Sequence, residues 1–228
     1  KLFFTHCPLV LITYGIEAWK PTGRFFVDSL VKKIDAFIAV SDFTRRKFLG
    51  WTYLNGRPGF ILPGAVDLNQ FTPGPKNLWL LKRYGLEGKK VLMTLARLEA
   101  RERYKGIDEV LEVLADLARE IPNIAYLVAG DGPDRKRLED KAKDLKIAGR
   151  VFFAGFIPES EKAEHYRLAD VFVMPGRGEG FGIVYLEALA CGVPVVASKL
   201  DASCEAVKDG KLGLLVDPKN PEEIKAAI

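Results

Sequence analysis

The sequence predicts an α/β fold in which parallel sheets carry helices on both faces. Its apolar runs are short and nearly continuous, as in strands buried on both faces, and helical stretches alternate with them along the chain. The turn-rich segment 67–76 (DLNQFTPGPK) is the best linker and divides this series unequally. We therefore expect the end of one doubly wound domain in residues 1–70 and most of a second one in residues 71–228.

Each element of the first part is predicted from a short local pattern. Ser41 directly follows a buried apolar run and is a typical N-cap residue, so a helix is expected to begin after it. Apolar runs and turn residues predict strands at 9–13, 37–40 and 60–62, and helices at 24–33 and 41–49.

The second part alternates strand and helix more regularly. Apolar residues in 107–121 recur at i, i+3, i+4 and i+7 and therefore lie on one helical face. The expected strands are 90–96, 125–129, 151–154, 171–174, 194–197 and 213–216, and the expected helices are 107–121, 134–145, 159–169, 182–190 and 221–228. The last helix begins with Asn220 as its cap and stops after about two turns. Because the chain also lacks an initial Met, we expect it to be a piece of a longer protein.

Composition and charge exclude several classes of protein. The 34 basic and 30 acidic residues leave a net charge of +4, which is too small for a dedicated nucleic-acid binder. No apolar run approaches the roughly 18–20 residues that a membrane-spanning helix needs. We therefore expect a soluble protein that binds no nucleic acid, and the cysteine usage described next favours a reducing cytoplasm.

Cysteine and histidine limit the chemistry further. The three cysteines, Cys7, Cys191 and Cys204, contain no C-x-x-C spacing, so neither a disulfide framework nor a zinc site is indicated. The two histidines, His6 and His165, are too few for a multi-histidine metal centre. We expect both to be structural, with His165 at the surface or half-buried.

The segment 174–198 (MPGRGEGFGIVYLEALACGVPVVAS) contains the most informative motif. A predicted strand leads into a loop with four glycines and then into a helix, and the N–H groups at a helix N-terminus bind anions. Glu179 and Glu187 flank this point and could bind two parts of one extended ligand, with phosphates between them. The residues around Glu187 are apolar, so its carboxylate needs a partner. A glycine-rich loop alone is a weak signal.

The motif E-G-F-G-x-x-x-x-E-A, which begins at Glu179, resembles the retaining glycosyltransferases of family GT4 (group 1), which have the GT-B fold. Other segments match in order: FIAVSDFT (37–44), LPGAVDLNQF (62–71), LARLEARERYKGID (95–108), VAGDGPDRKRLE (128–139), VFFAGFIP (151–158) and ADVFVMP (169–175). The resemblance implies two Rossmann-like domains and transfer of a hexose from a UDP- or GDP-sugar to an acceptor hydroxyl. It further implies retention of configuration, no metal and no cofactor, since the nucleotide-sugar is a co-substrate.

The resemblance also implies roles for individual residues. Glu179, Arg97 and Lys105 are the expected catalytic residues: Glu179 holds hydroxyls of the donor sugar, and the two cations neutralise the diphosphate. Charge develops on a phosphate oxygen as the diphosphate leaves, and cations held in a dry cleft stabilise it. The other residues expected to bind substrate are Glu187 at the ribose, Gly180, Phe181, Gly182 and Ile183 in the loop, Ile157, Glu159 and Lys162 near the base, and Tyr14, where relatives often have His.

Two alternatives stay open at this point. The chain could bind a nucleotide or nucleotide-sugar without transferring the sugar. The G-x-G of VAGDGPDRKRLE would suit an NAD(P)-dependent oxidoreductase, but Arg135 occupies the third glycine position of that fingerprint. The expected partners are a nucleotide-sugar donor and a glycan, lipid or small-molecule acceptor. A lipid acceptor would place the protein at the inner face of the membrane, with contact through the N-terminal part of the longer protein.

Overall fold

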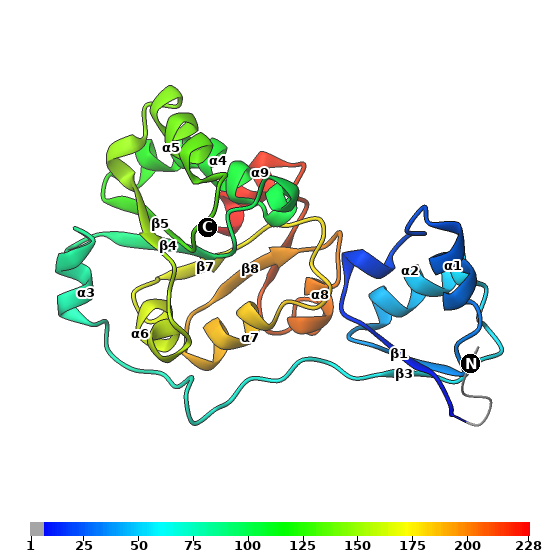
Figure 1. The fold of residues 1–228 in the computed structure, drawn as a ribbon. Coiled ribbons are helices and arrows are strands. Elements are labelled where there is room, and N and C mark those ends of the chain that lie inside the picture. Colours follow the sequence, from blue (N-terminus) through cyan, green and yellow to red (C-terminus); the bar gives the residue numbers. More distant parts are fainter. Residues whose placement is uncertain (1–6) are drawn as a thin grey trace.

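Two parallel sheets organise the computed structural model, which describes residues 7–228. The smaller sheet precedes the larger one in the sequence, and each has helices packed beside it (Figure 1). Residues 62–77, which form neither helix nor strand, connect them as a long segment along one side of the molecule. None of the helices in residues 7–228 has the length and apolar character needed to cross a membrane.

The smaller sheet has three parallel strands in the order β1-β2-β3. These are β1 (Val10–Thr13), β2 (Ala36–Ala39) and β3 (Gly59–Ile61), and the helical elements beside them are η1 (Ile16–Ala18), α1 (Phe25–Val31) and α2 (Asp42–Thr52). Gly59 pairs with Phe37, and a Cβ at Gly59 would lie 2.3 Å from the Phe37 ring, so only glycine fits there. Phe37 and Phe48 form the centre of a small separate core.

Ser41 is the N-cap of α2, as predicted. Its Oγ accepts a hydrogen bond from the Thr44 N–H at 3.0 Å and so satisfies one of the backbone donors that a helix start leaves free. The helix runs three residues further than expected, to Thr52. It ends where Tyr53 adopts a left-handed conformation with φ of 57°.

The larger sheet has six parallel strands in the order β6-β5-β4-β7-β8-β9. They are β4 (Lys90–Leu95), β5 (Ile124–Ala129), β6 (Val151–Gly155), β7 (Val171–Val173), β8 (Val195–Ser198) and β9 (Leu214–Val216). The chain builds outward from β4 to β6 and then returns to the other side of β4. The strand order therefore reverses between β4 and β7, as it does in Rossmann folds.

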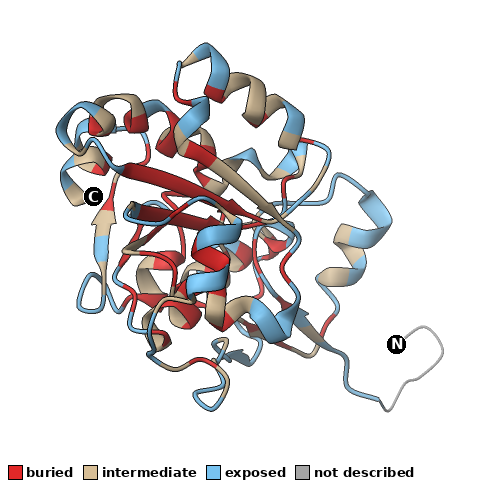
Figure 2. Cartoon of the chain, turned by 90° about the vertical axis from the view of Figure 1, so that its left-hand side faces the viewer, coloured by how far each residue is buried: buried red, intermediate tan, exposed pale blue. Residues whose placement is uncertain are grey.

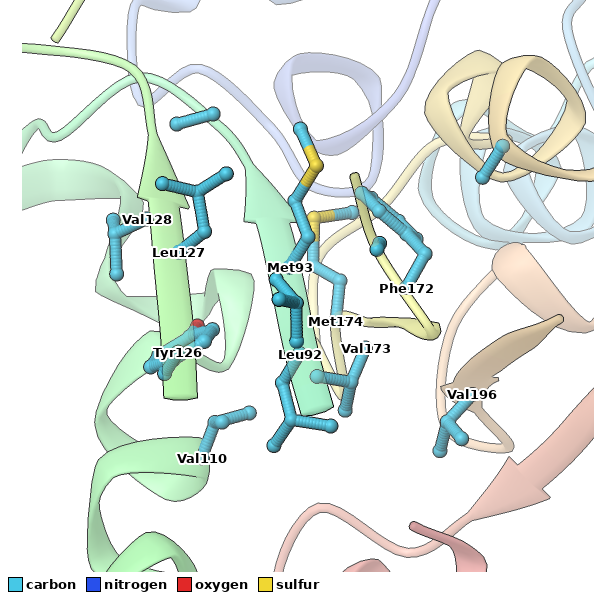
Figure 3. Packing of buried hydrophobic residues seen from close by; sticks show 14 of the residues in the cluster. Leu92, Met93, Val110, Tyr126, Leu127, Val128, Phe172, Val173, Met174 and Val196 are labelled. Carbon is cyan, nitrogen blue, oxygen red and sulfur yellow. The ribbon is translucent and has the colours of Figure 1, made fainter. Parts of the chain in front are cut away.

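Helices cover both faces of the larger sheet. The helical elements of this part of the chain are α3 (Leu78–Arg83), η2 (Ala100–Lys105), α4 (Ile107–Glu120), α5 (Arg135–Asp144), η3 (Ala148–Arg150), η4 (Glu159–Glu161), α6 (Lys162–Tyr166), α7 (Ile183–Ala190), α8 (Ser203–Ala206) and α9 (Pro221–Ala227). Figure 2 shows the central strands as buried and the outward sides of the surrounding helices as exposed. Every residue of β5 is buried, which explains why this strand is continuously apolar. Figure 3 shows Leu92 and Met93 of β4 among the side chains of β5 and β7.

The sequence predictions hold for the strands and less well for short helices. Each predicted strand is present with bounds within one residue of those expected. The helix expected at 159–169 is shorter, because η4 forms its first turn and α6 ends at Tyr166. α3 and α8 were not predicted, since each is too short to show a helical period. The domain boundary between residues 70 and 71 stays a prediction.

The core of the larger sheet yields a stability prediction. Leu111 of α4 is fully buried, so Leu111→Ala should lower the free energy of unfolding by about 2–5 kcal/mol through lost burial and a residual cavity. Leu78→Ala, at an exposed position, should change it by less than about 0.5 kcal/mol. Urea unfolding followed by circular dichroism measures both. Equal effects of the two substitutions would contradict the assignment of α4 to the core.

Candidate active site

A cleft of about 300 Å³ opens where the strand order reverses. Open α/β sheets bind ligands at this point, beyond the carboxyl ends of the strands. Tyr14 and Val40 of the first part line one side, and the other lining residues are Leu95, Lys105, Met174, Glu179, Phe181, Gly182, Ile183 and Val184. The fold therefore gathers several residues that the sequence selected, from segments far apart in the chain.

The glycine-rich loop after β7 lets backbones approach closely in this cleft. A Cβ on Gly180 would lie 2.0 Å from the carbonyl oxygen of Tyr14. Gly182 has a φ of 93°, and a Cβ there would come within 2.4 Å of the Tyr185 ring. No side chain caps α7 directly after Gly182, which leaves backbone donors of its first turn available to an anion.

Glu179 and Lys105 form an ion pair inside the cleft. Lys105 Nζ lies 2.7 Å from Glu179 Oε2, and less than a fifth of either side chain is exposed. Burial alone would lower the pKa of the Lys105 ammonium, but the Glu179 carboxylate outweighs this, and the pKa is raised. Lys105 therefore carries a positive charge at neutral pH.

Asp201 holds the backbone of Glu179, which sequence reasoning missed. The Glu179 N–H donates to Asp201 Oδ2 at 2.9 Å, and the Glu179 carbonyl accepts from the Ala202 N–H at 3.1 Å. Burial raises the pKa of the Asp201 carboxyl. The position of Asp201 three residues after β8 could have marked it as a site residue, because ligands bind beyond the carboxyl ends of such strands. The local sequence does not show, however, that this loop lies against the glycine-rich loop.

The second predicted cation, Arg97, has a different partner. Its guanidinium pairs with the Glu102 carboxylate of η2, and 78% of the Arg97 side chain is exposed. Arg97 is the second residue after β4 and lines a second cavity, of about 140 Å³. This cavity also contains the predicted residues Ile157 and Lys162, together with Leu95, Ala96, Gly130, Asp131 and Phe156.

Glu187 is buried and has the partners that its apolar surroundings required. The Tyr166 hydroxyl donates to Glu187 Oε2 at 2.6 Å, and Lys162 Nζ lies 3.4 Å from Glu187 Oε1. Burial, together with the adjacent carboxylate, raises the pKa of the Tyr166 hydroxyl well above its ordinary value. Lys162 also pairs with Glu159 at 2.7 Å, so three predicted residues meet here. Tyr166 was missed, because a tyrosine on a short helix has no distinctive local pattern.

The two glycines of the G-x-G segment after β5 are explained by close contacts between backbones. Gly130 has a φ of 124°, and a Cβ there would lie 1.8 Å from the carbonyl oxygen of Ala96. Gly132 approaches the carbonyl oxygen of Leu98 in the same way, with its Cβ position 2.4 Å away. These glycines therefore let the loops after β4 and β5 cross.

The family model of the group 1 glycosyl transferases matches residues 81–228. The chain belongs to this family. The sequence-based expectation of a glycosyltransferase is thereby confirmed at the level of the family.

Individual relatives add detail about the family. The chain is 37% identical to a GDP-mannose-dependent α-(1-6)-phosphatidylinositol monomannoside mannosyltransferase of Mycolicibacterium smegmatis, over 96% of this chain and 59% of that protein. It is 38% identical to a phosphatidyl-myo-inositol mannosyltransferase of the same species, over 86% of this chain and 48% of that protein. The chain thus spans about half to three-fifths of the length of these curated relatives.

Solved structures confirm the GT-B fold. The Anabaena protein HepE, crystallised with UDP and glucose, superposes with a TM-score of 0.82 over 98% of this chain and 61% of that chain, at 23% identity. Sucrose-phosphate synthase of Thermosynechococcus elongatus gives a TM-score of 0.74 over 89% and 50%, at 26% identity.

Within this group 1 glycosyltransferase chain, a charged network anchors η2, the segment that ends at Lys105. Arg103 of η2 donates to both carboxylate oxygens of Asp134, and Arg137 bridges Asp134 and Asp108. Hydrogen bonds from Arg137 and then Arg103 lower the pKa of Asp134 to about 2. Sequence reasoning missed this network, because its members lie on three separate elements.

The two histidines of this glycosyltransferase chain were also considered for chemistry, and His165 has a structural role. His165 is fully buried, which corrects the expectation of a surface or half-buried residue, and its ring nitrogens contact the Tyr84 hydroxyl and the Glu161 carbonyl. His6 lies outside the described residues. Within residues 7–228, no three His, Cys, Asp or Glu side chains are grouped so that they could hold a metal ion.

Asp134 makes stability depend on pH. Because its pKa is lowered in the folded state, its stabilisation is complete above the ordinary value of 3.8 and is lost as the pH falls toward 2. Asp134→Asn should lower the free energy of unfolding by about 1–3 kcal/mol at pH 7, and by less at pH 3. Urea unfolding at both pH values measures this. Asp144→Asn, at an exposed position on the same helix, serves as the control, and a pH-independent loss in Asp134→Asn would contradict the prediction.

Proposed function

We propose that this chain contains the donor site of a retaining glycosyltransferase, which moves a hexose from a nucleoside-diphosphate sugar to an acceptor hydroxyl without a metal. One observation carries the proposal. Glu179 with Lys105, and Glu187 with Lys162, form two carboxylate–cation pairs on either side of the start of α7. An extended ligand with a diphosphate in its middle suits this arrangement, since a helix N-terminus attracts anions.

The diphosphate is the part of the donor that the cations recognise. Lys105 is charged and partly buried, and Arg97 stands near the carboxyl end of β4, where it lines the second cavity. As the sugar–phosphate bond breaks, negative charge develops on the leaving oxygen. Lys105, Arg97 and the free N–H groups of α7 are arranged to stabilise this charge, which is the task that a metal performs in other transferases.

Glu179 positions the donor sugar in this proposal. Its carboxylate lines the cleft, and Gly180, Phe181, Gly182 and Ile183 place backbone groups beside it. The acceptor hydroxyl attacks the anomeric carbon on the face from which the diphosphate leaves, and this gives retention. A leaving phosphate oxygen takes the proton of the hydroxyl, so no protein base is required. Tyr14 also lines the cleft, and its hydroxyl is able to donate a hydrogen bond but, unlike a histidine, cannot become a cation near pH 7.

Glu187 binds the ribose, and the second cavity receives the base. Glu187 lies beside Lys162 and accepts a hydrogen bond from the Tyr166 hydroxyl, and a group that recognises ribose must accept hydrogen bonds in the same way. Ile157, Glu159 and Lys162 surround the place of the base. GDP-mannose is the proposed donor, because a similar relative is named for it, and a lipid-linked inositol glycan is the proposed acceptor on the same grounds. A lipid acceptor would bring the enzyme to the cytoplasmic face of a membrane.

A calorimetric panel of GDP, UDP, ADP and NADH tests the ribose assignment and the donor class. Glu187→Ala should weaken GDP binding by about 10- to 100-fold, because charge-assisted hydrogen bonds to the ribose are lost. Glu120→Gln, on the far end of α4, is the matched control and should bind as the wild type does. Equal affinities of Glu187→Ala and wild type would refute the ribose assignment. Binding of NADH but of no nucleoside diphosphate would instead favour an oxidoreductase.

Transfer itself is tested at Glu179 in the natural polypeptide that carries this sequence. Glu179→Ala should lower kcat for mannose transfer or release from GDP-mannose by about 100-fold or more, while the Kd for GDP changes by less than about 3-fold. Released mannose and calorimetry provide the two measurements. A wild type that binds GDP-mannose and returns it intact, with or without acceptor, would identify a binding module without transferase activity.

A further inference from the structure

Glu179 is held at its side chain by Lys105 and at its backbone by other residues. In the proposed function a diphosphate takes Lys105 away from Glu179, so the ion pair between them does not last through the reaction. Glu179 also lies between Gly178 and Gly180, and glycine neighbours restrict the backbone little. The contacts of the Glu179 backbone therefore have to keep its carboxylate aimed at the sugar.

Asp201 makes the main contact of this kind with a fully buried carboxylate. Its Oδ2 accepts from the Glu179 N–H at 2.9 Å, and its Oδ1 accepts from the N–H of Ser203 at 3.0 Å and from the hydroxyl of Ser203 at 2.6 Å. These three donors are neutral. A carboxylate that is buried among neutral donors is costly to keep ionised, and such groups gather at functional sites.

Ser203 connects Asp201 to the sheet. The Ser203 Oγ accepts from the N–H of Ser198, the last residue of β8, at 3.1 Å, and both serines are fully buried. A relay of hydrogen bonds thus runs from Ser198 through Ser203 and Asp201 to the Glu179 N–H. Since β8 is paired with β7 on one side and with β9 on the other, the relay ties Glu179 to a fixed part of the sheet.

A simple turn does not account for Asp201. An aspartate whose carboxylate accepts from the N–H two residues further on forms a common turn, and Asp217 does so after β9, with the Lys219 N–H at 2.9 Å. Asp201 makes the same turn with Ser203 but also uses its second oxygen for Glu179, 22 residues away. Among the described residues, those that line the cleft do not include Asp201, so it acts on a substrate through Glu179.

We propose that Asp201, oriented by Ser203, is a positioning residue that fixes Glu179 for the donor sugar. This inference rests on the proposed role of Glu179 and adds the residues that make this role possible. Neither Asp201 nor Ser203 belongs to the groups assigned to the ribose, the base or the diphosphate. Loss of the relay should therefore lower kcat and leave nucleotide affinity unchanged.

Substitution of Asp201 in the natural polypeptide tests the relay. Asp201→Ala should lower kcat for GDP-mannose turnover by about 10-fold or more, with the Kd for GDP within about 3-fold of wild type. Asp201→Asn keeps one acceptor oxygen and should lose less. Asp217→Ala is the matched control, because it removes the same kind of turn at a neighbouring strand, and its kcat should stay within about 2-fold of wild type. A parallel loss of kcat and GDP affinity in Asp201→Ala overturns the proposal.

A second variant keeps the test decisive if Asp201→Ala fails to fold. Ser203→Ala removes the hydroxyl between Asp201 and Ser198 but keeps the Ser203 N–H as a donor, and it should lower kcat by about 3- to 10-fold at unchanged GDP affinity. Unchanged kcat in every folded variant of Asp201 and Ser203 overturns the proposal.

Hydrogen–deuterium exchange provides a measurement that needs no activity. The peptide that contains Glu179 should exchange faster in Asp201→Ala and Ser203→Ala than in the wild type, because the Glu179 N–H loses a firmly held acceptor. In Asp217→Ala it should exchange as in the wild type. Equal exchange in the wild type and the folded relay variants overturns the relay. If the wild type turns over no nucleotide-sugar, the proposed function fails, and exchange alone then decides the relay.

Discussion

The reversal of strand order between β4 and β7 is the constraint on which the site depends. On one side of β4 the chain runs to β5 and β6, and on the other it runs to β7, β8 and β9, so the loops after β4 and β7 diverge and leave a space between them. Arg97 follows β4, and the glycine-rich loop with Glu179 follows β7. The residues of the candidate site therefore meet because of topology rather than because of sequence proximity.

Charge pairing is the second organising feature of the cleft. Lys105, Lys162 and Arg97 each have a carboxylate partner, namely Glu179, Glu187 and Glu102. Lys105 and Lys162 are largely buried and need such partners, since an unpaired charge away from water is costly, whereas most of the Arg97 side chain is exposed. Despite burial, which alone would lower them, the pKa values of Lys105 and Lys162 are raised by their carboxylate partners, so both stay charged. When a diphosphate binds, each lysine would exchange one anionic partner for another. The network around Asp134 holds η2 so that Lys105 stays at the cleft.

The strands and the glycine-rich motif could be predicted because their signals are local. A strand buried on both faces must be continuously apolar, and Gly182 requires a conformation that other residues rarely adopt. The partners of the acidic residues could not be predicted. Tyr166 reaches Glu187 across 21 residues, and Glu205 reaches the Asp42 N–H across 163. Such pairs depend on how helices dock, and α8, which carries Glu205, has too few residues to show a period.

By itself, the sequence determined the layered α/β fold, the order of its elements and the family motif with Glu179 and Glu187. These properties follow from apolar periodicity and from residue types at short spacing. Only the tertiary structure decided that Lys105 pairs with Glu179, that Arg97 turns to Glu102, and that α2 is capped from the other part of the chain. Electrostatic and hydrogen-bond partners are set by distances in space. The packing of loops around the larger sheet sets the first two distances, and the docking of the two sheets sets the third.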